Sequence, residues 1–74
     1  MSAYAIYIYE FGDEWGTARY DVDQMTIDHN RYLPMDLSDA IIKTTTEHDG
    51  QEAFSGRTRC FTFRCEMIEE DNNA

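Results

Sequence analysis

Apolar and polar residues alternate along two segments of the chain, which is the period of a β-strand with one buried and one solvated face. These segments are residues 18–23 (ARYDVD) and 60–67 (CFTFRCEM). Residues 3–11 (AYAIYIYEF) are apolar on both sides and rich in β-branched and aromatic side chains. Such side chains pack well on a pleated surface, so this segment also favours a strand. The pattern therefore predicts three strands.

The segments between these strands carry turn and helix signals. Residues 12–16 (GDEWG) predict a five-residue turn that reverses the first strand into the second. Residues 25–35 (MTIDHNRYLPM) show neither period and end beside a proline, so we expect an irregular connection with one extended stretch. A strand at residues 57–69 would place Cys60 and Cys65 on opposite faces, and we expect both to be reduced thiols.

Residues 37–48 predict a helix, with Asp36 or Ser38 as its cap and Gly50 as its stop. The residues that fall near one helical face are Leu37, Ala40, Ile41, Thr45 and His48. The run 44–46 (TTT) is a poor helix former, so a strand that ends in an Asp49-Gly50 hairpin turn is the alternative.

The order β-β-α-β predicts a two-layer α+β fold, in which one helix covers one face of a three-stranded, mainly antiparallel sheet. We expect the strand at 3–11 to lie in the centre, beside the last strand. The 74 residues allow one small α+β domain, residues 1–74, with an acidic frayed end at about 69–74.

One helix leaves the other face of such a sheet uncovered. Ile6 and Ile8 are expected beneath the helix with Ala18, Tyr20, Val22, Phe61 and Phe63. Tyr7 and Tyr9 then lie on the open face, near Arg19, Asp21, Thr62 and Arg64. Tyrosine and arginine are enriched in protein interfaces, so this face predicts contact with a partner or a second copy. The alternative is that the tyrosines tolerate solvent or that segment 25–35 covers them.

The chain carries 15 acidic against 6 basic residues, and its net charge of −9 is spread over both halves. Nucleic acids and anionic membranes attract basic surfaces, so this charge argues against both as direct partners. The longest apolar run has seven residues (3–9), against the roughly 18 that a membrane span needs. No secretory signal is recognisable, and we expect a cytoplasmic protein. Acidity that serves solubility or adaptation to salt remains the simpler explanation of the charge.

No catalytic motif or cofactor fingerprint occurs in the chain, so we expect neither enzymatic activity nor a bound cofactor. His29 and His48 stand beside carboxylates, and with Asp21 or Asp23 they would offer metal ligands. Their spacing matches no known metal motif, so we expect no metal site.

The acidic surface itself is the remaining candidate for function. Asp21 and Asp23 on one strand face would lie about 6.6 to 6.8 Å apart, and Asp13 and Glu14 at the turn would extend the row. Because DNA carries one charge per about 3.4 Å along each strand, two such residues span about two phosphate steps. Trp15 at the same turn is expected to pack against the hairpin.

In size, acidity and lack of a cofactor motif, the chain resembles small phage-encoded inhibitors such as anti-CRISPR proteins and DNA-mimicking anti-restriction proteins. The resemblance implies a stoichiometric inhibitor, acting in the host cytoplasm, that occupies a basic nucleic-acid-binding surface of a CRISPR-Cas or restriction complex. The residues expected to bind this partner are Tyr7, Tyr9, Asp13, Glu14, Arg19, Asp21 and Asp23. The alternative is a homodimeric structural or regulatory protein whose acidity serves only solubility.

Overall fold

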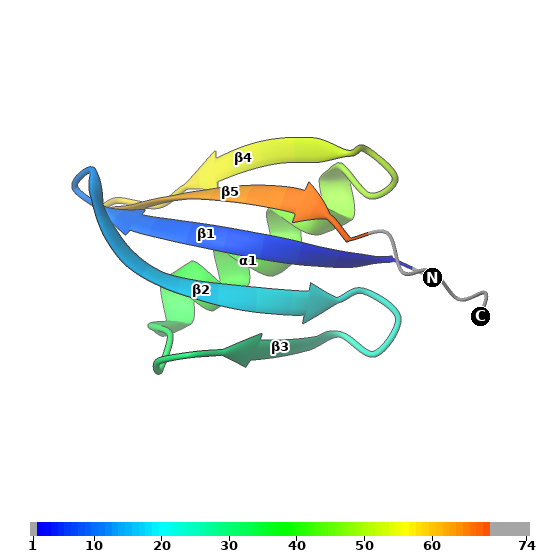
Figure 1. Ribbon diagram of the computed structural model, residues 1–74, viewed down its shortest axis with the longest axis horizontal. Helices are drawn as coiled ribbons and strands as arrows, with labels where there is room; N and C mark the ends of the chain where they lie inside the picture. The colour runs from blue at the N-terminus through cyan, green and yellow to red at the C-terminus, as the bar shows by residue number, and fades with distance from the viewer. Residues whose placement is uncertain (1, 69–74) are drawn as a thin grey trace.

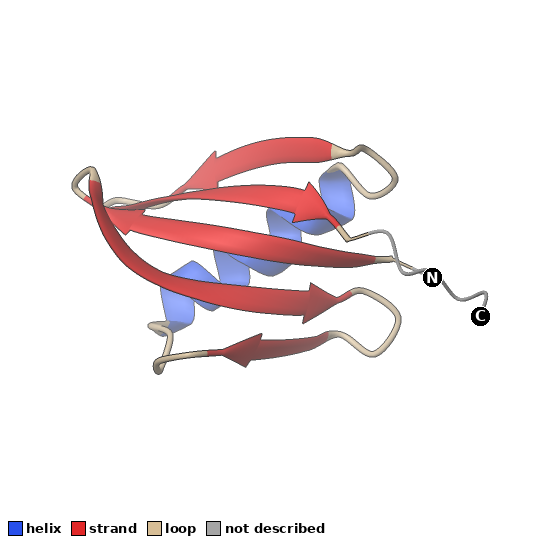
Figure 2. Ribbon diagram, viewed as in Figure 1, coloured by secondary structure: helices blue, strands red, loops and turns tan. Residues whose placement is uncertain are grey.

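The computed structural model describes residues 2–68, in which one helix packs on one face of a five-stranded antiparallel sheet (Figures 1 and 2). The elements are β1 (Ala3–Glu10), β2 (Asp13–Asp21), β3 (Thr26–His29), α1 (Met35–Glu47), β4 (Ala53–Arg57) and β5 (Phe61–Met67). Their order across the sheet is β3-β2-β1-β5-β4. The two-layer α+β class is confirmed, as is the central place of β1 beside the last strand. The predicted acidic end at 69–74 lies outside the described residues.

The prediction of three strands was wrong, because β3 and β4 add one edge strand on each side. β3 is the one extended stretch expected within the irregular segment 25–35, and Ile27 is its one partly buried residue. In β4, Phe54 is buried while Gly56 lies close to Phe63 of β5. Each of these short edge strands has one large apolar residue, so neither shows the repeated alternation of apolar and polar residues that predicts a strand.

The five-residue turn predicted for 12–16 was also wrong. Glu10 pairs with Asp13, so the turn consists of Phe11 and Gly12, with φ angles of 50° and 88°. Two positive φ angles are typical of the tight type I′ hairpin turn, whose twist matches that of the flanking strands. Asp13 to Gly16 therefore belong to β2, and the register shifts where Tyr9 pairs with Glu14 but Ile8 pairs with Gly16.

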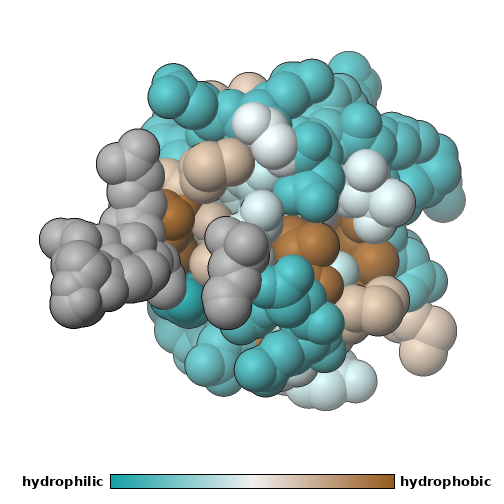
Figure 3. Space-filling view, turned by 90° about the vertical axis from the view of Figure 1, so that its right-hand side faces the viewer, coloured by the Kyte–Doolittle hydropathy of each residue, from teal (hydrophilic) through white to brown (hydrophobic). Residues whose placement is uncertain are grey.

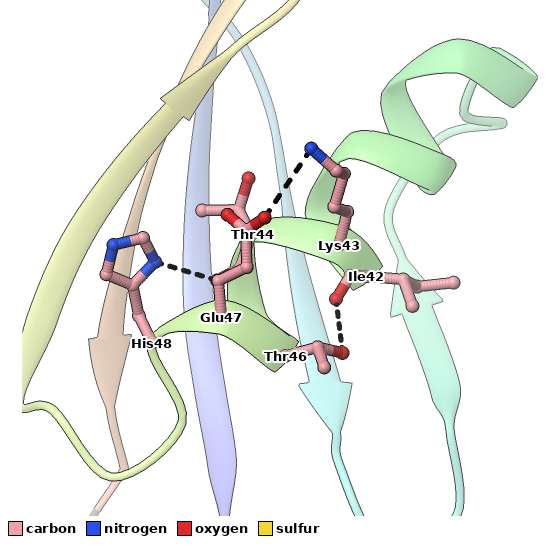
Figure 4. Close-up of polar contacts among 6 residues, drawn as sticks. All are labelled: Ile42, Lys43, Thr44, Thr46, Glu47 and His48. Atoms are coloured by element: carbon pink, nitrogen blue, oxygen red, sulfur yellow. Dashed lines mark hydrogen bonds and ion pairs between the residues drawn. The ribbon is translucent and has the colours of Figure 1, made fainter.

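Helix α1 confirms the helix predicted for residues 37–48. The alternative, a strand that ends in an Asp49-Gly50 hairpin turn, is wrong. Neither Asp36 nor Ser38 caps it: Pro34 occupies the N-cap position, and no side chain bonds the first turn. The buried face consists of Leu37, Ile41 and Thr45. At the C-terminus of α1, His48 Nδ1 lies 2.9 Å from the Thr44 carbonyl oxygen. Figure 4 draws this contact and the nearby Lys43–Glu47 ion pair.

The core lies between α1 and the sheet and contains the predicted Ile6 and Ile8. Of the other residues expected there, Ala18, Tyr20, Phe61 and Phe63 are buried, and Val22 is only partly buried. The core also holds Tyr4, whose hydroxyl accepts a hydrogen bond from the Gly50 N–H at 2.9 Å. Cys65 is buried and Cys60 half-buried, both as free thiols.

Candidate functional site

The face of the sheet opposite α1, turned toward the viewer in Figure 1, is uncovered by any described helix. We call it the open face and define it by the strand registers, which align its side chains in three rows. The first row is Glu14, Tyr9, Thr62 and Arg57, and the second is Thr17, Tyr7, Arg64 and Ser55. The third is Asp28, Arg19, Ala5, Glu66 and Ala53. Tyr7 and Tyr9 thus occupy its centre.

Contacts within the open face hold Arg64 in place. Its guanidinium lies 5.2 Å from the centroid of the Tyr7 ring, within the range of a cation–π interaction. Its Nε donates a hydrogen bond to Glu66 Oε2 at 2.9 Å. Within residues 2–68, Arg64 donates no other hydrogen bond. Its position is fixed in the free protein, which lowers the entropy cost of any contact it makes.

Two shallow hollows flank Tyr9 on this face. One of about 360 Å³ is lined by Tyr7, Tyr9, Glu14 and Trp15, among others. The other, of about 320 Å³, has three hydroxyl-bearing residues and two arginines in its lining. These are Tyr9, Ser55, Thr62, Arg57 and Arg64. The open face is therefore uneven, with a carboxylate beside one hollow and guanidinium groups beside the other.

Trp15 packs at the hairpin, as expected. Its ring meets Phe61 edge-on at 4.9 Å between centroids, and the Arg31 guanidinium lies 4.2 Å from its centroid. Arg31 Nη1 also donates to the Trp15 carbonyl at 3.0 Å. These contacts tie the segment after β3 to β2 and leave Trp15 half-buried.

The four predicted carboxylates do not form one row. Asp13 and Glu14 lie at the start of β2 and Asp21 at its end, roughly 23 to 26 Å away for strand residues seven or eight positions apart. Asp23 follows the end of β2, so it does not share a strand face with Asp21. The Asp21 Oδ1 instead accepts a hydrogen bond from the Gln24 N–H at 3.2 Å and stabilises the turn to β3.

A different set of carboxylates lies at the end of the sheet where β2 and β5 terminate. Two loops lie at this end, the turn after β2 at the lower right of Figure 1 and the loop between α1 and β4 at the upper right, with β1 and β5 between them. They and the adjoining end of β2 carry Asp21, Asp23, Asp49 and Glu52, which we call the acidic end. None of these carboxylates forms an ion pair with another residue of 2–68. Figure 3 views this end, where hydrophilic surface lies above and below an apolar band.

Carboxylates of the acidic end raise the pKa values of two buried tyrosines, Tyr4 and Tyr20. Burial raises the pKa of Tyr20, and the nearby Asp21 and Asp49 raise it further. Burial likewise raises the pKa of Tyr4; the hydrogen bond from Gly50 lowers it and Asp49 raises it. Asp21 and Asp49 therefore act on the same hydroxyl although 28 positions separate them in sequence. Sequence reasoning missed Asp49 and Glu52 because contacts with Tyr4, which is distant in sequence, place the loop that carries them.

No three His, Cys, Asp or Glu side chains of residues 2–68 are grouped so that they could hold a metal ion. His29 packs edge-on to Tyr32, and His48 stacks on Phe54 at 5.1 Å. Over the same residues, no helix has the length and apolar character needed to cross a membrane. The chain matches no protein-family model, and no curated protein or solved structure is significantly similar to it.

Proposed function

We propose that the protein is a non-enzymatic acidic binding protein that inhibits a nucleic-acid-handling complex, such as a CRISPR-Cas or restriction complex, by occupying its basic surface. The observation that supports this proposal is the acidic end, where two loops distant in sequence carry carboxylates that form no ion pair with another residue of 2–68, on a chain of net charge −9. A field of one sign steers a partner of opposite charge and raises the association rate.

The loop that carries Asp49 is anchored, which suits a binding surface. Tyr4 is fully buried, and its hydroxyl lies 3.4 Å from both Asp49 Oδ1 and the Gln51 carbonyl. The same hydroxyl accepts the Gly50 N–H at 2.9 Å. These contacts order the loop in the free protein, so a partner bound there would pay little entropy to fix it. Asp13 and Glu14 lie at the opposite end of β2 and would contribute only long-range attraction.

The proposal is tested by capture from a bacterial lysate at low and at moderate salt. The wild-type chain should retain a DNA- or RNA-handling complex at low salt and lose it as salt screens the charges. A variant with Asp23→Asn, Asp49→Asn and Glu52→Gln should capture less, chiefly because association slows. The matched control removes the same charge away from the acidic end, with Asp13→Asn, Asp36→Asn and Asp39→Asn.

The control separates a local surface from net charge. If both triple variants lose capture equally, total charge rather than the acidic end accounts for binding. If the wild-type chain retains no basic protein even at low salt, the proposed inhibition is wrong.

A further inference from the structure

The open face carries complementary groups that cannot meet within one molecule. Glu14 of β2 and Arg57 of β4 lie in the same row, separated by β1 and β5. Three strand spacings put their backbones roughly 14 Å apart. Neither side chain forms an ion pair with another residue of 2–68, and both are exposed. Each therefore presents an unpaired charge on an otherwise tyrosine-bearing surface.

A two-fold rotation relates these groups to each other. Consider an axis that runs parallel to the strands, above the open face and between β1 and β5. Rotation about it exchanges β2 with β4 and β1 with β5 across the gap between two copies. Glu14 then faces the second copy's Arg57 and Tyr7 faces its Arg64, while Tyr9 faces its Thr62. The hydroxyls of the second row, Thr17 and Ser55, also come opposite each other.

We infer that the open face binds a second copy of this chain, face to face about this axis. Two-fold symmetry makes every contact occur twice, so one Glu14–Arg57 match supplies two ion pairs. Aligned sheets that stack about 10 Å apart interdigitate their side chains, and the hollows beside Tyr9 leave room for this. The inference concerns a surface other than the acidic end and does not depend on the proposed inhibition.

The area of the open face sets the strength to expect. Four strands over about seven residues cover roughly 20 Å by 23 Å of sheet, which is smaller than the roughly 800 Å² that each partner buries in a standard interface. The copies also repel each other through their net charge. We therefore expect a concentration-dependent dimer, measured at about 0.15 M salt, where the Debye length is about 8 Å.

Charge exchange across the axis gives the decisive test. Arg57→Glu leaves only carboxylates at the Glu14–Arg57 contact, and Glu14→Arg leaves only guanidinium groups there. Each variant alone should dimerise at least about tenfold more weakly than the wild type, by sedimentation over a concentration series. An equimolar mixture of the two should restore the dimer, because the contact again joins opposite charges. Arg59→Glu and Asp39→Arg are the matched controls, and thermal unfolding checks that every variant folds.

A second substitution probes the aromatic contact without changing charge. Tyr7→Ser should weaken the dimer, because it removes a half-buried ring opposite Arg64 of the second copy, whereas Tyr32→Ser removes a ring that is 83% exposed and should not. A wild-type chain that stays monomeric across the series would overturn the inference. So would charge variants that dimerise like the wild type, or a mixture that stays dissociated.

Discussion

Burial of the Thr45 hydroxyl works against stability. It is fully buried in the helix face, and its Oγ1 has no hydrogen-bond partner in the described structure. A buried hydroxyl without a partner pays the full cost of losing water, so Thr45→Val, which keeps the shape, should stabilise the fold by about 1 kcal/mol. Urea unfolding measures the change. Thr46→Val is the control, since its exposed hydroxyl donates to the Ile42 carbonyl at 2.8 Å (Figure 4). A destabilised Thr45→Val variant would show that the hydroxyl has a partner.

Cys65 makes stability depend on pH in alkaline solution. Burial raises the pKa of its thiol from 9.0 to about 11. The folded chain thus holds this proton more tightly than the unfolded chain does. The resulting stability is complete below about pH 9 and is lost as the pH rises toward 11.

Replacing Cys65 by Ala should therefore flatten the fall of the unfolding free energy between about pH 9 and pH 10.5. Part of the fall should persist, because the pKa values of Tyr4 and Tyr20 are raised as well. Urea titrations under reducing conditions at several pH values measure the slope. Cys60→Ala leaves Cys65 in place and should keep the wild-type slope. Equal slopes for all three proteins would contradict the role given to Cys65.

At the scale of elements, β4 packs closely against β5 because residue 56 is a glycine and has no side chain. A Cβ at Gly56 would lie 2.8 Å from Phe63 Cε1 and 2.9 Å from Thr44 Oγ1. Gly56→Ala should destabilise the fold by roughly 1 to 3 kcal/mol through overpacking. Phe63→Leu replaces the ring with a smaller side chain and should relieve the clash. The double variant should therefore be more stable than the sum of the two single effects predicts. Additive effects in the urea midpoints would contradict this contact.

The elements that the sequence predicted are those with a buried face. β1, the second half of β2, α1 and β5 each bury alternate or helically spaced apolar residues, and hydrophobic periodicity detects such burial. The edge strands β3 and β4 each have one large apolar residue, Ile27 and Phe54, which is too few to show a period in the sequence. The hairpin turn was missed because Phe11 adopts a φ of 50°, a conformation that favours Gly, Asn or Asp.

The same distinction applies to the candidate surfaces. Tyr7 and Tyr9 could be placed on the open face beside Thr62 and Arg64, because strand alternation and the β1–β5 pairing fix their positions. The acidic row failed because its geometry depends on where β2 ends and how loops turn. No periodic pattern in the sequence indicates that Asp21 and Asp49 both raise the pKa of Tyr20.

At the scale of the whole molecule, the net charge of −9 opposes folding, because a compact chain brings like charges together. Salt screens this repulsion more than it weakens the ion pairs Lys43–Glu47 and Arg64–Glu66, which are exposed and contribute little. The melting temperature should therefore rise by several degrees when NaCl increases from about 0.02 M to 0.5 M.

A variant of lower charge shows whether repulsion causes this effect. Asp36→Asn with Asp39→Asn removes two exposed carboxylates of α1 and should reduce the rise in melting temperature. Equal rises would indicate that salt acts through stronger burial of apolar groups instead. A melting temperature that falls with NaCl would mean that attractive pairs outweigh repulsion. The charged residues would then stabilise the fold most at low salt, and adaptation to high salt would not explain the net charge of −9.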